Sequence, residues 1–168
     1  MIRRFSLASL VLAVLAAGCS QPPRQDIAAD KAKLQSDALA WFNAFAKGDS
    51  EAVANMYAED AVVMPPGMPA VNGRAAIKSF MGRMAAEVQA AKLSLKHGET
   101  TGSDVSGDVG WISGTYSVVD SAGTTVDSGS YLSAHRRTNG TWLYVRDTWI
   151  SDRPPAPPQQ AHRKPSKM

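Results

Sequence analysis

The hydrophobic pattern of this chain changes its period once, near residue 91, and that change limits the fold more than any other feature of the sequence. Before it, apolar residues recur every three or four positions, which is the spacing of one face of an α-helix. After it, apolar and polar residues alternate, which is typical of strands with one buried face. A set of helices followed by a set of strands predicts an α+β domain with an antiparallel sheet.

Three helices are predicted before the change. The first spans about 27–47, and the Gly-Asp pair at 48–49 supplies a stop for it and an N-cap for a short second helix over about 50–57. A brief apolar run at 61–64 ends at two prolines, and the Asn-Gly pair at 72–73 opens the third helix. The apolar stripes of these helices are formed by Leu34, Ala38, Trp41, Phe42, Phe45, Val53, Met56, Tyr57, Ile77, Phe80, Met81, Met84 and Val88.

Four long strands are predicted after the change. The first begins with the alternation at 93–96, and the others cover 108–119, 126–137 and 141–151. Gly123 and an Asn-Gly pair at 139–140 supply hairpin turns between them. We expect this sheet to curve over the three helices and to leave a concave inner face.

The part of the chain that forms the domain is 26–151, which is long enough for one hydrophobic core. Residues 152–168 are rich in proline, which cannot donate to a sheet ladder, and are predicted to form an extended tail.

The chain has 18 basic and 15 acidic residues, but 12 basic and 14 acidic residues remain in 19–151. The domain therefore lacks the basic face of a nucleic-acid-binding protein, and we predict no nucleic-acid partner.

Residues 1–18 have the layout of a bacterial export signal, in which two arginines precede an apolar run of about 13 residues, too short to span a bilayer. The single cysteine, Cys19, follows small residues at 16–18, and this segment resembles the lipobox of bacterial lipoproteins. The resemblance implies a lipid-modified Cys19, a tether over 19–25 and an anchor on the periplasmic face of the outer membrane. A plain secretory signal with a chance cysteine is the alternative.

Short motifs between residues 41 and 152 have the order and spacing of one known superfamily. They are Trp41-x₆-Gly48-Asp49, Tyr57-x-x-Asp60-Ala61, Asn72-Gly73-Arg74, Gly114-x-Tyr116, Gly129-x-Tyr131 and Asn139-Gly140-x-Trp142. Together they resemble the nuclear transport factor 2-like superfamily, in its SnoaL-like and ketosteroid isomerase-like branch. The resemblance implies a cone, in which a strongly curved sheet wraps three N-terminal helices around a pocket at the wide end. It also implies pairing of two copies through their sheets.

The catalytic residues of the isomerases do not carry over to this sequence. Alignment on the motifs places Pro65 where the isomerases have their carboxylate base, Trp41 where they have a tyrosine donor, and Leu132 near their protonated aspartate. That chemistry needs a base and two donors aimed at the developing oxyanion, and neither proline nor leucine supplies them. Isomerase activity by that mechanism is not expected.

Asp147 is the candidate functional acid. Alternation along the last strand puts it on one face with Trp149, and the resemblance makes that face the inner one, with Trp142, Tyr144 and Ile150 outside. A buried carboxylate among apolar groups has to be hydrogen-bonded, paired or protonated. Asp147 could therefore be a pocket acid that anchors a ligand or acts as a general acid/base. Alternatively, it has a structural role and accepts hydrogen bonds from nearby loop N–H groups or a tyrosine hydroxyl. The structural role is favoured.

The other ligand-binding candidates are large apolar side chains, namely Trp41, Tyr57, Met64, Trp111 and Trp149. Met64 is expected on the floor of the cavity, while Trp41, Tyr57 and Trp111 are better explained as core residues than as ligand contacts. His135 is expected to point outward, and the three histidines have no metal-ligand spacing, so neither a metal site nor a cofactor is predicted.

Two functions remain open after the sequence alone. The first is a membrane-anchored, non-catalytic domain that binds a small apolar molecule and forms a homodimer through its outer sheet face. The second is a SnoaL-like isomerase, cyclase or hydratase that uses Asp147 as acid/base on a small organic substrate. The first is preferred, because the sequence supplies one acid among mostly apolar partners.

Overall fold

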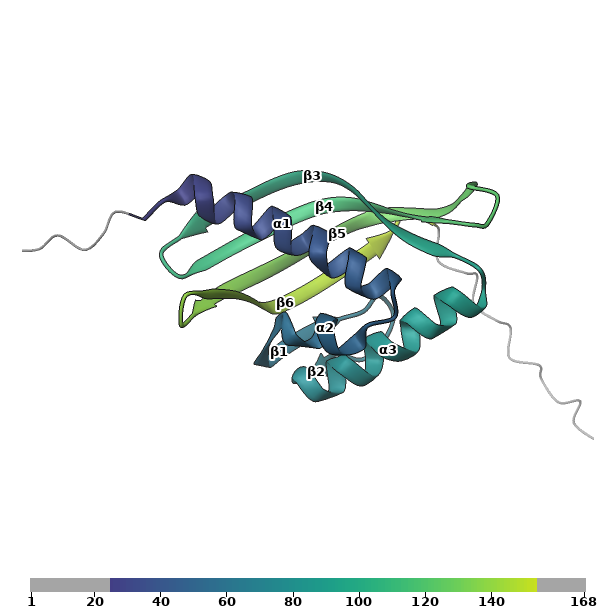
Figure 1. Cartoon of the computed structure of the whole chain (residues 1–168), viewed down its shortest axis with the longest axis horizontal. Helices are drawn as coiled ribbons and strands as arrows, with labels where there is room; N and C mark the ends of the chain where they lie inside the picture. Colours follow the sequence, from purple (N-terminus) through teal and green to yellow (C-terminus); the bar gives the residue numbers. More distant parts are fainter. Residues whose placement is uncertain (1–24, 154–168) are drawn as a thin grey trace, which may run out of the picture.

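The computed structural model describes residues 25–153. They form the three predicted helices and one sheet of six strands, in which β1 and β2 join the four predicted long strands. The helices lie along one side of the sheet (Figure 1). The elements are α1 (Ile27–Ala46), α2 (Ser50–Asn55), β1 (Tyr57–Met64), β2 (Val71–Asn72), α3 (Arg74–Ala90), β3 (Ser94–Ser106), β4 (Val109–Val119), β5 (Thr125–Thr138) and β6 (Thr141–Ser151). The predicted leader, Cys19 and nearly all of the tail lie outside the described residues.

Aspartate caps begin the first two helices. The carboxylate of Asp26 accepts from the backbone N–H of Ala29 at 3.0 Å, and that of Asp49 accepts from Ala52 at 2.9 Å. Between the two helices, Gly48 takes a φ of +73°, a conformation that glycine adopts without steric cost. The predicted boundary between them is confirmed.

Tyr57 is the first residue of β1 and does not belong to α2, which corrects the prediction of a helix over 50–57. α2 ends at Asn55, and the backbone N–H of Tyr144 on β6 donates to the carbonyl of Met56 at 2.9 Å. The helix thus ends two residues earlier than helical spacing suggests, and β1 begins at Tyr57. This change places the Tyr57 side chain inside the sheet layer.

The sheet has the strand order β2-β1-β6-β5-β4-β3 and remains open. The hairpins β3–β4, β4–β5 and β5–β6 are antiparallel, whereas β1 runs parallel to β6. α1 lies across the inner side of the long strands, and α2 and α3 lie near β1 and β2 (Figure 1). The fold is therefore the predicted α+β arrangement, with one parallel pair added.

A bulge in β6 decides which side chains face the helices. The β5–β6 register shifts between Ala134, which is opposite Arg146, and His135, which is opposite Tyr144. One extra residue reverses the alternation of a strand, so Trp142 and Tyr144 point to the same side as Asp147. Both aromatic side chains are buried, which corrects the prediction that they lie on the outer face.

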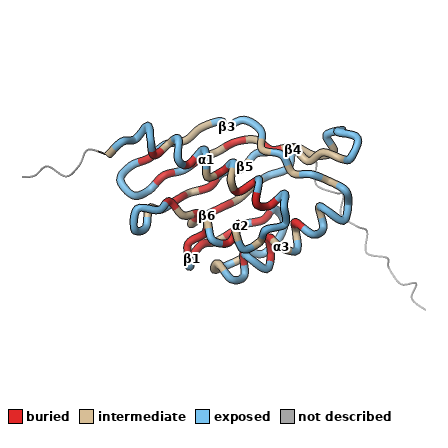
Figure 2. The backbone as a smooth tube through the Cα atoms, viewed as in Figure 1, coloured by how far each residue is buried: buried red, intermediate tan, exposed pale blue. Residues whose placement is uncertain are grey.

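The hydrophobic core has two parts. The larger part joins α1, α2 and α3 to the inner face of β1, β4 and β6, and the smaller part packs Leu34 and Ala38 of α1 against Ile112 and Trp142. Figure 2 shows buried positions where α1 and the strands face each other. No helix of residues 25–153 has the length and apolar character needed to cross a membrane.

Candidate functional site

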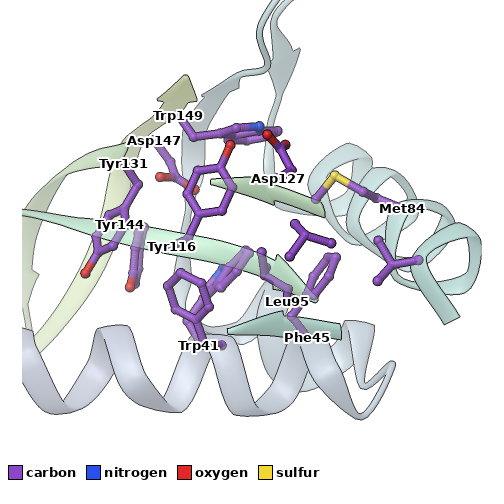
Figure 3. A pocket seen from close by; sticks show the side chains of 13 residues that line it. Trp41, Phe45, Met84, Leu95, Tyr116, Asp127, Tyr131, Tyr144, Asp147 and Trp149 are labelled. Carbon is purple, nitrogen blue, oxygen red and sulfur yellow. The ribbon is translucent and has the colours of Figure 1, made fainter. Parts of the chain in front are cut away.

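A cavity of about 170 Å³ opens between α1, α3 and the inner face of the sheet (Figure 3). Seven of its thirteen lining residues are aromatic, four are aliphatic and two are acidic. The aromatic residues are Trp41, Phe42, Phe45, Tyr116, Tyr131, Tyr144 and Trp149; the others are Met84, Val88, Leu95, Val118, Asp127 and Asp147. Concave, mostly apolar sites with a few polar groups are typical of small-molecule binding.

Asp147 lies on β6, between the neighbouring strands β1 and β5. It is opposite Ser133 on β5 and opposite Val63 on β1, and both of these neighbours are fully buried. The aspartate itself is 7% exposed, although it lines the cavity. The predicted inward orientation of Asp147 is what the structure has.

A chain of hydrogen bonds from α1 ends at the Asp147 carboxylate. The indole N–H of Trp41 donates to the hydroxyl of Tyr57 at 3.0 Å, and that hydroxyl donates to Oδ2 of Asp147 at 2.6 Å. Each donor satisfies a buried polar atom that would otherwise carry a desolvation cost. The three residues come from α1, β1 and β6, so the chain also ties these elements together.

Burial raises the pKa of Asp147 to about 6, although the hydrogen bonds from Tyr57 and from the backbone of Thr148 favour the charged form. The pKa of Tyr57 is raised well above 10 by its own burial and by the nearby carboxylate. Tyr57 therefore stays protonated and remains a donor at neutral pH. Asp147 changes charge within one to two units of neutrality, which suits either a ligand anchor or an acid/base.

Two glycines make room for tyrosine rings on the neighbouring strand. Gly114 is opposite Tyr131, and a Cβ added at Gly114 would lie 2.6 Å from the Tyr131 hydroxyl oxygen. Gly129 is opposite Tyr116, and a Cβ there would lie 2.6 Å from the Tyr116 hydroxyl oxygen. The two Gly-x-Tyr motifs therefore interlock across β4 and β5, and both rings lie over backbone and line the cavity.

Asp127, the second acid of the lining, is matched by groups at the end of β6. Its Oδ1 accepts from the Ser151 hydroxyl at 2.7 Å and lies 3.7 Å from Nε of Arg153. Its side chain is about a quarter exposed. Unlike Asp147, it has both solvent and a cation beside it.

Three of the six predicted ligand-binding residues line the cavity, namely Trp41, Asp147 and Trp149. Tyr57 lies behind the lining and acts through its hydrogen bond to Asp147. Met64 and Trp111 are 40% and 42% exposed and lie outside the cavity, which corrects both expectations. Each of the two is next in sequence to a buried inward residue, so alternation turns it to the outer face.

His135 points inward, which corrects the expectation that it points outward. It is fully buried, with Nε2 3.0 Å from the Ser133 hydroxyl and its ring 4.1 Å from that of Tyr144. Leu132, expected near the position of a donor, is 49% exposed on the outer face, and its inward neighbours are Tyr131 and Ser133. Burial lowers the pKa of His135 to about 4, so this ring is neutral at physiological pH.

The sequence reading missed most of the aromatic lining. Tyr116, Tyr131, Tyr144, Phe42 and Phe45 line the cavity, although the sequence did not predict any of them as ligand-binding residues. The paired Gly-x-Tyr motifs were a usable signal for the first two, because glycine in a strand often marks close approach of another group. No group of three potential metal ligands comes together in the described part of the chain.

The sequence of this domain matches a known protein family. A family profile for the SnoaL-like domain matches residues 38–145, from the middle of α1 to β6. The chain belongs to the SnoaL-like family. The match covers most of the domain, including Trp41 and Tyr57, and stops two residues before Asp147. No match was found among functionally curated proteins.

Solved structures that resemble this SnoaL-like domain share its fold. A nuclear transport factor 2-like protein with a cystatin-like fold from Novosphingobium aromaticivorans aligns with a TM-score of 0.65 at 23% identity, over 73% of this chain and 81% of that one. A ketosteroid isomerase-like protein from Erwinia carotovora atroseptica aligns with a TM-score of 0.56 at 22% identity, over 74% and 98%. A nuclear transport factor 2-like protein of unknown function from Pseudomonas putida aligns with a TM-score of 0.65 at 14% identity, over 73% and 86%. At such identities the likeness concerns the fold alone.

Proposed function

We propose that this SnoaL-like domain binds one small, mostly apolar molecule in its cavity without transforming it. The observation that carries the proposal is the lining itself, in which eleven of thirteen side chains are aromatic or aliphatic. A cavity of about 170 Å³ is close to the roughly 150 Å³ at which an apolar cavity holds benzene. A ligand with one ring or a short branched chain therefore suits the space.

The cavity lacks the set of catalytic groups that the isomerases use. The sequence positions that resemble the isomerase base and first donor hold Pro65 and Trp41, and Trp41 already donates to Tyr57. The pKa of Asp147 is raised by burial to about 6, which makes it the candidate acid/base at this cavity. A proton moved by Asp147 would need a second positioned group to stabilise the developing charge.

A catalytic role for Asp147 is the second candidate function, and its pKa of about 6 favours it. In that case the protein is an isomerase, cyclase or hydratase in which Asp147 exchanges a proton with the substrate while Tyr57 and Trp41 orient the carboxyl. The substitution Asp147→Asn separates the two functions on any substrate that is found. Unchanged turnover in this variant removes the acid/base role, and loss of turnover with retained binding supports it.

Binding itself is tested by filling the cavity. Val118 lines it, whereas the next residue, Val119, faces the other side of β4 by alternation. Native mass spectrometry of the protein from its own host should detect a retained small molecule in the unaltered chain and in Val119→Trp, but not in Val118→Trp. For a chain isolated without ligand, the same three proteins are titrated with benzyl alcohol, and equal binding by all three would contradict the proposal.

We further propose that the domain is held on the periplasmic face of the outer membrane by lipid on Cys19. The support is the sequence before the domain, in which the single cysteine directly follows an export-signal pattern. Several acyl chains, at about 0.8 kcal/mol per buried CH₂, give stable anchoring. The tether over 19–25 then leads directly to α1, which begins at Ile27.

Pairing of two copies through the outer sheet face completes the proposal. That face carries Met64, Trp111, Leu132 and Ile150, all more than a third exposed. Contiguous exposed apolar side chains on a soluble domain indicate an interaction surface. Trp142 and Tyr144, first expected on this surface, are excluded from it because they are buried on the inner side.

A further inference from the structure

The two most buried carboxylates of this domain have opposite surroundings. Asp30 on α1 accepts two hydrogen bonds from the guanidinium of Arg137, at 2.9 and 2.7 Å, and one from the indole of Trp142 at 3.1 Å. Asp147 takes part in none of the ion pairs within residues 25–153. Asp30 is a buried charge with its counter-charge, and Asp147 is a buried charge without one.

A buried carboxylate is costly unless a cation or several donors accompany it. The two acids respond accordingly. Burial works to raise the pKa of Asp30, but its hydrogen bonds from Gln25, Arg137 and Trp142 outweigh burial and lower it. For Asp147 burial prevails and the pKa is raised, despite the bond from Tyr57.

A ligand in the cavity can supply the counter-charge that Asp147 lacks, because the carboxylate lines the cavity (Figure 3). Among the described residues no Lys, Arg or His side chain lines that cavity, and its other acid, Asp127, already has Arg153 at 3.7 Å. A cation that enters the cavity therefore meets a carboxylate and no repelling charge. An anion meets two acids and no attracting charge.

The aromatic side chains of the lining also favour a cation over an anion. Tyrosine and tryptophan rings are negative on their faces and attract cations that lie over them. Trp149, Tyr116, Tyr131 and Tyr144 line the cavity together with Asp147, and none of these rings has a described cation over it. The single cation–π contact in residues 25–153 joins Arg137 to Trp142, which lies outside the cavity.

We propose that the ligand of this cavity is a small organic ammonium ion, with an apolar body held by the aromatic rings and its cationic nitrogen at the Asp147 carboxylate. The inference rests on the proposed binding function and adds the charge of the ligand to it. The cavity volume of about 170 Å³ limits the apolar body of the ligand to about one ring. The ammonium group supplies a positive counter-charge to Asp147, as the guanidinium of Arg137 does to Asp30.

Three probes with one ring and different head groups test the proposal: benzylamine, benzyl alcohol and benzoate. Each is titrated calorimetrically into the full chain at about pH 7.5, where benzylamine is a cation and Asp147 is mostly charged. Benzylamine should bind at least about tenfold more tightly than benzyl alcohol, since one desolvated cation–π or charge contact is worth about that factor. Benzoate should bind more weakly than the alcohol.

The variant Asp147→Asn keeps an acceptor for Tyr57 and removes the charge. In it, benzylamine should fall to the affinity of benzyl alcohol, while the alcohol keeps its own affinity within about threefold. The cavity-filling Val118→Trp should abolish binding of both probes. If Asp147→Asn does not fold, the ranking of the three probes on the unaltered chain and their loss in Val118→Trp decide the matter.

Equal or weaker binding of benzylamine than of benzyl alcohol would overturn the ammonium ligand and leave the binding function intact. Binding of benzylamine that survives both variants would overturn it as well, because the cation would then be held elsewhere. If none of the three probes binds, both the ammonium ligand and the proposed binding function fail.

Discussion

Removing the charge of Asp147 should stabilise the folded protein at neutral pH, and by an amount that depends on pH. The folded-state pKa of Asp147 is about 6, against 3.8 for an ordinary aspartate. Between these values the folded protein holds a proton that the unfolded chain has lost. The contribution of Asp147 to stability is therefore largest at low pH and is lost as the pH rises through about 6.

The size of the effect follows from the shift. A rise of about two pKa units corresponds to about 3 kcal/mol of unfolding free energy, at about 1.4 kcal/mol per unit. Asparagine has nearly the same shape, still accepts from Tyr57 and does not titrate in this range. The difference in unfolding free energy between Asp147→Asn and the unaltered protein should thus increase by up to about 3 kcal/mol from pH 4 to pH 8.

Urea unfolding of both proteins between about pH 4 and about pH 8 measures this difference, and any fixed offset from the substitution cancels. Asp60 supplies a control of the opposite sign, because its hydrogen bond from Arg136 lowers its pKa. For Asp60→Asn, the loss relative to the unaltered protein should shrink toward low pH. A difference for Asp147→Asn that is constant across the range would refute the burial of an uncompensated charge.

Three further predictions concern other parts of the molecule. Asp30→Ala leaves the guanidinium of Arg137 and the indole of Trp142 without their shared acceptor, so urea unfolding should show a loss of about 3 kcal/mol; a loss below about 1 kcal/mol would contradict the ion pair. Leu132→Glu places a charge on the outer face, and sedimentation should change from dimer to monomer. Leu39→Glu changes an equally exposed leucine on α1, on the other side of the sheet, and should leave the dimer intact. Cys19→Ser should move the protein from the membrane to the soluble periplasmic fraction, and unchanged membrane association would exclude a lipid anchor on Cys19.

The helices and the hairpins could be predicted because their signals are local. Gly48 and Asp49 end one helix and begin the next, and the Asn139-Gly140 turn has Asn139 at a φ of +50° and Gly140 at +80°, as a tight hairpin requires. The inward side of Asp147 was predictable from the family resemblance together with the alternation of Asp147 and Trp149, which lie beyond the bulge. These features depend on neighbours within a few positions.

The features that were missed depend on distant partners. The β6 bulge that turns Tyr144 inward is defined by the register against β5 and has no unambiguous sign in the β6 sequence. Tyr57 was assigned to a helix because the apolar stripe continues to it, and only pairing with β6 ends that helix earlier. The contact from Tyr57 to Asp147 joins residues 90 positions apart, which no local pattern encodes.

The indole N–H signals of the four tryptophans give the most direct test of a ligand-binding cavity. Trp41 and Trp149 line it, whereas Trp111 is exposed on the outer face and Trp142 packs against Leu34 and Ala38 in the other part of the core. In a nitrogen-15 NMR titration with benzylamine, the signals of Trp41 and Trp149 should shift together, while those of Trp111 and Trp142 stay in place. Absence of any shift, or a shift at Trp111 alone, would contradict the account.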